Sequence, residues 1–244
     1  MASEKLAAMR AVPRGVAEEF RQNRYLGLMC IGAALCAGMA LLSAGSSVMG
    51  GQSETMWLEA IFEVFSAFAL GYFTWRFFAL RESVSGPKAG KARKSCIIVF
   101  AVMMITVVFL GIFYWVLYST LRGADPEELL ENMSREYIDS LWALLPITIT
   151  GFVIQVCQAI AQVFLFRAMG DMELMAEGRY PKRNSFTAAS NAAALAAGMS
   201  ICGVIMNLMT GFGLVNLIAA LPEVLLYLSM CLLCRATSEK AVFA

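Results

Sequence analysis

Long apolar runs that are almost free of charge alternate along the chain with short basic stretches, and this pattern constrains the fold most strongly. The chain has 244 residues, of which 59% are hydrophobic and only 15% charged, whereas a soluble domain carries about 25% charged residues. A helix needs about 20 apolar residues to cross the hydrocarbon core of a bilayer. Several runs reach that length, so the sequence predicts an all-α, polytopic integral membrane protein that contacts the lipid bilayer.

The apolar runs predict one six-helix transmembrane domain over residues 25–235, between a cytoplasmic tail at 1–24 and a second tail at 236–244. The six predicted spans cover approximately residues 25–46, 55–78, 95–121, 140–166, 186–209 and 213–234. The first run is longer than the apolar core of a signal peptide, so we expect it to stay in the mature protein.

The basic residues predict the orientation in the membrane. With these spans, 17 of the 19 lysines and arginines fall on one side, and only Arg122 and Arg135 fall on the other. Short cytoplasmic loops are enriched in Lys and Arg, so both termini are expected to be cytoplasmic in a cell-membrane protein. We expect two basic segments to contact anionic lipids, namely the N-terminal tail, whose amphipathic pattern Pro13 interrupts, and a flexible loop at 85–94.

Two stretches of the chain repeat one another at an offset of 160 residues. AALCAGM at 33–39 reappears as AALAAGM at 193–199, and eleven of the 32 positions from 33 to 64 match their counterparts. We therefore predict that the first and last two-helix hairpins are repeated units, with the middle hairpin as a more divergent third. The alanines and glycines of the repeat are expected to let membrane helices pack closely.

Three glutamates fall within the predicted spans, namely Glu59, Glu63 and Glu223, and the last two occupy equivalent positions of the repeat. Glu59 shares a helix face with Glu63 but lies nearer the outer interface. A charged side chain in hydrocarbon is costly, so such residues usually face the bundle interior or an aqueous cavity. We expect these acids to be protonated, hydrogen-bonded to neutral partners, or in contact with water or a cation.

Two prolines are predicted to open the helices near the acids. Pro222 directly precedes Glu223, and Pro146 has the corresponding place in the fourth span. A proline inside a helix leaves the carbonyl one turn earlier without its usual donor. That carbonyl is then free to bind an ion or water.

Neutral amides extend the polar surface within the membrane. Gln155, Gln158 and Gln162 follow an i, i+3, i+7 spacing that places them on one face of the fourth span, and Asn216 adds an amide to the last span. These residues predict a polar conduit or binding site that leads away from the glutamates. The alternative is that they form only the hydrogen bonds that hold membrane helices together.

Several kinds of chemistry are not expected from this sequence. Histidine is absent, which excludes histidine general bases and histidine-ligated metals. The chain has no GxxxxGK[ST] phosphate-binding motif and no evident nucleophile–base pair. We therefore expect no enzyme activity, no cofactor, no metal and no nucleic-acid partner.

Two functions fit these features. The first is a transporter of a small solute or ion that is coupled to protons through the intramembrane glutamates. The alternative is a non-catalytic membrane component, such as a permease partner subunit, a sensor or an assembly factor, in which the polar residues are structural. Either function is compatible with a homo-oligomer or with a partner subunit.

Overall fold

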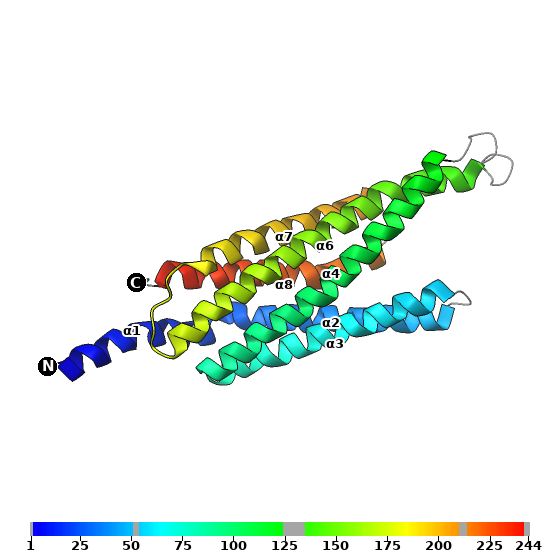
Figure 1. Ribbon diagram of the computed structural model, residues 1–244. Helices are drawn as coiled ribbons and strands as arrows, with labels where there is room; N and C mark the ends of the chain where they lie inside the picture. The colour runs from blue at the N-terminus through cyan, green and yellow to red at the C-terminus, as the bar shows by residue number, and fades with distance from the viewer. Residues whose placement is uncertain (1, 51–53, 124–134, 210–213, 242–244) are drawn as a thin grey trace.

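The structure is a computed structural model that describes residues 2–50, 54–123, 135–209 and 214–241; for some residues, including Glu59, Pro146 and Asn216, it describes the backbone only. Every regular element within these ranges is a helix, which confirms the all-α prediction. The described residues form seven helices (Figure 1): α1 (Ala2–Gln22), α2 (Arg24–Gly50), α3 (Glu54–Glu82), α4 (Gly86–Gly123), α6 (Arg135–Ala176), α7 (Ser185–Met209) and α8 (Leu214–Lys240).

Five helices have a described stretch that is long and apolar enough to cross a membrane. These stretches are Arg24–Val48, Gly86–Phe109, Ile149–Ala176, Ser185–Met206 and Ala220–Lys240. The chain is therefore a multi-pass membrane protein. The predicted span at 55–78 coincides with α3, which is not among the five. Glu63 and Arg76 lower the mean hydropathy of this helix. Its outer face nevertheless exposes large aromatic side chains such as Phe65 and Phe68.

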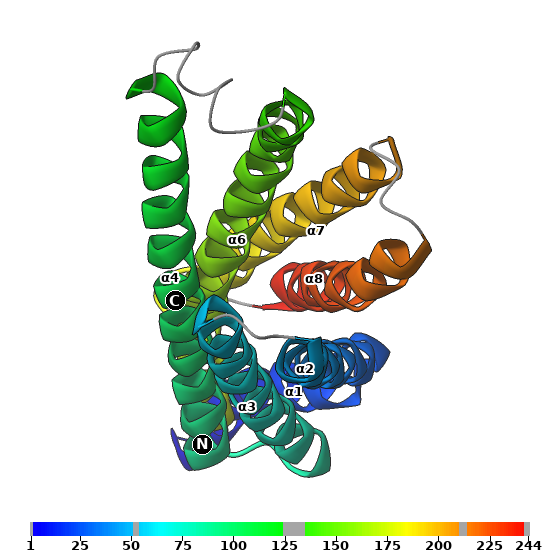
Figure 2. The same ribbon diagram turned by 90° about the vertical axis from the view of Figure 1, so that its right-hand side faces the viewer.

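Six of the helices form a closed ring in chain order. Each of α2, α3, α4, α6 and α7 packs against the next, and α8 closes the ring against α2. Figure 2 shows these helices fanning around a common centre. In Figure 1 the α2–α3 hairpin diverges from the α4–α6 hairpin toward the end of the molecule opposite the two termini.

The α2–α8 contact that closes the ring depends on a glycine. A Cβ atom built on Gly32 would lie 2.7 Å from the backbone nitrogen of Leu226, so α8 approaches the bare backbone of α2. Ala33, in the first copy of the alanine-rich motif, and Ala193, in the second copy, are both completely buried. These contacts agree with the close packing of small residues that the sequence predicts.

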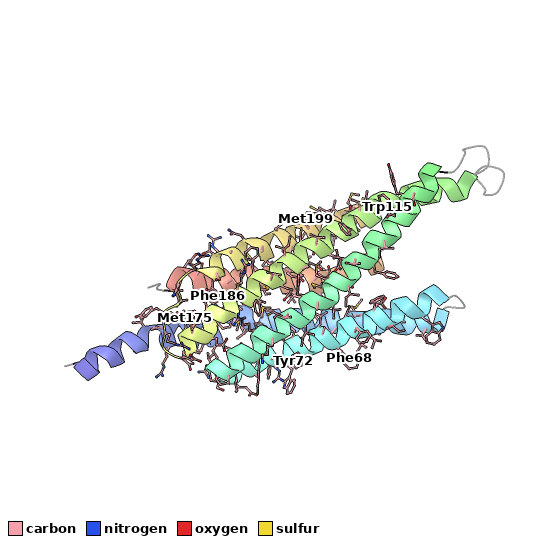
Figure 3. The ribbon with its side chains drawn as sticks, viewed as in Figure 1. Phe68, Tyr72, Trp115, Met175, Phe186 and Met199 are labelled. Atoms are coloured by element: carbon pink, nitrogen blue, oxygen red, sulfur yellow. The ribbon has the colours of Figure 1, made fainter. Side chains whose placement is uncertain are left out.

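The apolar core lies toward the end that carries the termini. Large side chains from six helices are fully buried, including Phe73, Phe77, Met172 and Phe186. Figure 3 shows Phe186 and Met175 at this end, whereas Trp115 lies near the opposite end of α4. Trp115 is 70% exposed. The ring is thus tightly filled at the end near the termini.

The N-terminal tail is more ordered than predicted. The expectation that Pro13 interrupts its amphipathic pattern is wrong, because α1 runs through Pro13 without a break. Val16 and Phe20 are buried in the core, and the Phe20 ring lies 6.4 Å from that of Phe186. Burying this apolar face of α1 against α6 and α8 offsets the cost of a proline inside a helix.

The segment at 85–94 is also not the flexible loop that was expected. Its residues form the first turns of α4, in which Pro87 suits the N-terminal turn and the Ala89 amide donates a 2.9 Å hydrogen bond to the Ser85 carbonyl. Gly90 lets α6 approach so closely that an added Cβ would meet a Glu173 oxygen at 2.8 Å. Arg93 lies 3.5 Å from the same carboxylate, so part of the basic charge is paired within the protein.

Candidate functional site

A cavity of about 410 Å³ lies between α2, α3, α4, α6 and α8. Most of the lining side chains are apolar, and they include Leu70, Val102 and Met103. Two carboxylates face this apolar surface, one from Glu63 on α3 and one from Glu223 on α8. The structure thus brings together two acids that are 160 positions apart in the sequence.

Glu63 is held by the helix that precedes it in the chain. The Ser43 hydroxyl on α2 donates a 2.5 Å hydrogen bond to Oε1 of Glu63 on α3. Both side chains are half-buried and both line the cavity. A hydrogen bond from a hydroxyl donor stabilises the carboxyl group.

Glu223 on α8 is held by side chains from two other helices. The Gln158 amide on α6 donates a 2.9 Å hydrogen bond to Oε2 of Glu223 on α8. The same amide nitrogen lies 3.3 Å from the hydroxyl of Ser200 on α7, which also hydrogen-bonds to the carboxylate. Gln158 is almost completely buried. This network connects the second acid to the wall opposite the α2–α3 hairpin.

Pro222 lies inside α8, and the helix continues beyond it to Lys240. Its side chain is buried, one residue before the acid that lines the cavity. Since proline has no N–H, the carbonyl of Ile218 has no donor within the helix. The predicted freed carbonyl therefore lies five residues before Glu223 on the same helix.

The three glutamines of α6 lie on one face, as their spacing predicts. Gln155 and Gln158 line the cavity. Gln162, one turn further along, is fully buried, and within the described part of the chain neither of its amide atoms has a hydrogen-bond partner of normal geometry. It lies beside the hydroxyl of Tyr227, which contacts the sulfur of Met103 at 3.9 Å.

Three of the predicted site residues cannot be placed. The side chains of Glu59, Pro146 and Asn216 lie outside the described residues, although their backbones belong to α3, α6 and α8. For metals, the residues that the structure describes contain no group of three or more Cys, Asp or Glu side chains arranged to hold an ion.

Sequence reasoning missed several residues that complete the site. Ser43 and Ser200 bind the two acids, and Tyr227 lines the cavity beside Gln162. A serine in an apolar helix is a common and uninformative residue. The 160-residue offset does not find them either, because the counterpart of Ser43 at that offset is Gly203 and not Ser200. Periodicity within single helices carries no information on which helices meet.

No known family model matches this chain, and neither a curated protein nor a solved structure is similar to it. The cavity and its residues are therefore the features that bear on the function of this protein.

Proposed function

We propose that this protein is a transporter of a small solute or ion, coupled to protons through Glu63 and Glu223. The observation that supports this proposal is that two carboxylates from different hairpins line one cavity within the helix ring. Their described hydrogen-bond partners are the neutral residues Ser43, Gln158 and Ser200. Intramembrane acids that face a cavity are typical of proton relays and substrate pathways.

In this proposal α3 is the sixth membrane span. It runs beside α2 over a similar length, with 29 residues against 27, and so can cross the same bilayer. Its exposed aromatic residues suit lipid, while its Glu63 face points to the cavity. A bundle interior accommodates the acid that lowers the hydropathy of this helix.

We further propose that the termini are cytoplasmic and that the cavity is accessible from the opposite side. The basic residues gather near the termini, which favours a cytoplasmic location for that end. The same end is filled by large buried side chains such as Phe77 and Met172. The α2–α3 and α4–α6 hairpins diverge at the other end (Figure 1). On this proposal the chain adopts an outward-facing state, and the side of access is what labelling of Cys36 tests.

The repeat supplies a reason for the paired acids. If α2–α3 and α7–α8 arose by duplication, equivalent glutamates would face a common centre from two sides, as Glu63 and Glu223 do. Transporter binding sites often lie at the interface between repeated units. Superposition of the two hairpins tests this origin; helices that cross at unrelated angles would contradict it.

Proton exchange in proteoliposomes tests the proposed function. Vesicles that contain the protein and an internal pH-sensitive dye are exposed in turn to pools of alkali cations, organic cations, amino acids and sugars. The proposal predicts a protein-dependent dye response to one pool, which E63Q and E223Q abolish. Matched controls on the same helices are E82Q and E239Q, because both side chains are exposed at the end near the termini.

Thermal unfolding of each variant separates loss of function from loss of fold. A response that persists when both cavity acids are replaced would contradict proton coupling through them. If the parent responds to no pool while the protein is folded, the transport proposal fails, and a structural role for the polar residues is favoured instead.

A further inference from the structure

We propose that the cavity binds an organic cation with an apolar body, such as a quaternary ammonium compound or a hydrophobic amine. This inference rests on the proposed transport function for its biological meaning, but the binding itself is testable without transport. Four properties of the site support it: the sign of its charged groups, the character of its walls, its volume and a buried amide beside it that lacks a well-formed hydrogen bond to the described residues.

The charged groups of the cavity are both acids. Among the lining residues, the titratable side chains are Cys36 on α2, Glu63 on α3, and Glu223 and Tyr227 on α8. The described lining residues of α4 and α6 are neutral, and none of the 17 is a lysine or an arginine. Cationic side chains instead form ion pairs near the termini, as Lys240 does with Glu19 at 2.8 Å. A ligand cation is thus the complementary charge for this cavity.

The walls favour an organic rather than a hydrated ion. Apolar side chains from four helices, including Met39, Leu70, Val102 and Leu226, make up most of the surface around the acids. Methionine adapts to irregular apolar ligands. A small hard cation requires six or more oxygen ligands, whereas a quaternary ammonium group binds through its apolar surface and its net charge. The volume of about 410 Å³ lies within the range of small-molecule sites.

A buried amide beside the cavity also points to a ligand or water. Gln162 is fully buried, and its two amide atoms have no hydrogen-bond partner of normal geometry among the described residues. It lies one turn beyond Gln158 and adjacent to Tyr227, which are both lining residues. An amide that lacks a well-formed hydrogen bond is costly to bury, so a ligand with an N–H donor, such as a hydrophobic amine, would stabilise this position from the cavity side.

Cation binding at these acids also explains how solute and protons can be coupled. A protonated glutamic acid that binds the cation releases its proton and becomes the carboxylate counter-ion. One proton then leaves the site for each cation that enters it, and the total charge of the cavity does not change. The reverse exchange occurs when a proton returns and the cation leaves.

The binding experiment uses full-length protein in lipid nanodiscs and radiolabelled benzyltrimethylammonium. The competitors are the unlabelled cation, tetramethylammonium, neopentylbenzene as a neutral compound of the same shape, and phenylmethanesulfonate as an anion with a similar body. We expect saturable binding that the unlabelled cation displaces, with tetramethylammonium weaker by at least about tenfold because it lacks the apolar body. The neutral and anionic compounds should not displace the label.

Variants and proton counting locate the site. E63Q and E223Q should each weaken binding roughly tenfold, since each removes one charged contact, whereas E82Q and E239Q should leave it unchanged. In weak buffer, a pH indicator should record release of about one proton per bound cation. If the Gln variants fail to fold, the native protein is treated with a hydrophobic carbodiimide in the presence and absence of the cation. Peptide mass spectrometry should then show that the bound cation protects Glu63 and Glu223 from modification.

Three results would overturn the inference: no saturable binding of the cation, equal displacement by the neutral compound or the anion, or binding that both Gln substitutions leave intact. Failure of the transport proposal is distinguishable. A protein that binds the cation at these acids but moves no protons in liposomes retains the ligand class and loses the transport function. A protein that couples protons to sugars but binds no cation retains the transport function and loses the proposed ligand class.

Discussion

The side-chain amide of Gln158 on α6 donates a 2.9 Å hydrogen bond to the carboxylate of Glu223 on α8, and its nitrogen lies 3.3 Å from the hydroxyl of Ser200 on α7. One buried glutamine therefore joins three helices around an acid that lines the central cavity. Ser43 on α2 donates a hydrogen bond to Glu63 on α3 and so joins these two helices. Both acids are thus positioned by neutral donors.

Replacing Gln158 with leucine is expected to destabilise the protein by about 1–3 kcal/mol, because it leaves the Glu223 carboxyl group without its donor. Q155L is the matched control, since Gln155 lines the same cavity from the same helix. Thermal unfolding in detergent should show a clearly larger decrease in Tm for Q158L than for Q155L. Equal decreases in Tm for the two variants would indicate that the hydrogen bond from Gln158 to Glu223 does not contribute to stability.

Gly32→Ala should separate α2 from α8. An added Cβ would meet the Leu226 nitrogen at 2.7 Å and its Cα at 2.9 Å, and forced overpacking of this kind typically costs about 1–3 kcal/mol. The control is Gly38→Ala on the same helix, where a Cβ would meet nothing within 4 Å. Its helix propensity should make G38A neutral or slightly stabilising. Equal stability of G32A and G38A would contradict the close contact between α2 and α8 at Gly32.

Phe20→Ala tests whether α1 belongs to the folded body. Phe20 is 1% exposed and packs near Phe186, so its truncation should cost about 3–5 kcal/mol. Val12, on the same helix, is 46% exposed, and V12A should change the stability by less than about 0.5 kcal/mol. The measurement is the unfolding midpoint of each variant. If the N-terminal segment did not pack against the other helices, F20A and V12A would have the same unfolding midpoint.

Cys36 provides a native probe of the charge and the access side of the cavity. It lines the cavity, whereas Cys202 on α7 is exposed on the outer surface of the ring. A cationic methanethiosulfonate should modify Cys36 at least about tenfold faster than its anionic analogue, because the two acids concentrate cations locally. Peptide mass spectrometry measures both rates, with C36S as the blank.

The same reagent tests the orientation. In sealed vesicles of known sidedness, the proposal predicts that Cys36 reacts from the side opposite the termini. Reaction from the terminal side alone would reverse the proposed access route, and faster modification by the anionic reagent would contradict the acidic character of the cavity.

Part of the fold and of the site could be predicted from the sequence. Hydropathy located the helices, because burial in lipid requires long apolar runs, and the i, i+3, i+7 spacing placed Gln155, Gln158 and Gln162 on one face. The sequence match at an offset of 160 residues drew attention to Glu63 and Glu223, although the repeated hairpins themselves stay a prediction. It could not show that both line one cavity, because this depends on the order in which six helices close a ring.

The wrong predictions have a common cause. The segment at 85–94 was expected to be a loop because of its charge and its glycines, yet Gly90 lets α4 approach Glu173 of α6 and Arg93 pairs with that acid. Likewise, Pro13 was expected to interrupt α1, whose packing against the bundle compensates for it. In both cases a contact between distant helices outweighed the local preference. Ser43 and Ser200 were missed for the same reason.

The most direct test of the central proposal is a double-mutant cycle of E63Q and E223Q, read as initial rates of proton exchange in proteoliposomes with the solute pool that drives the parent. If the two acids share one cavity and one proton-exchange step, each single variant loses most of the rate, and the double variant is little worse than either one. Additive losses would show that the acids act at separate sites. Rates equal to that of the parent in all three variants would show that neither acid takes part in transport.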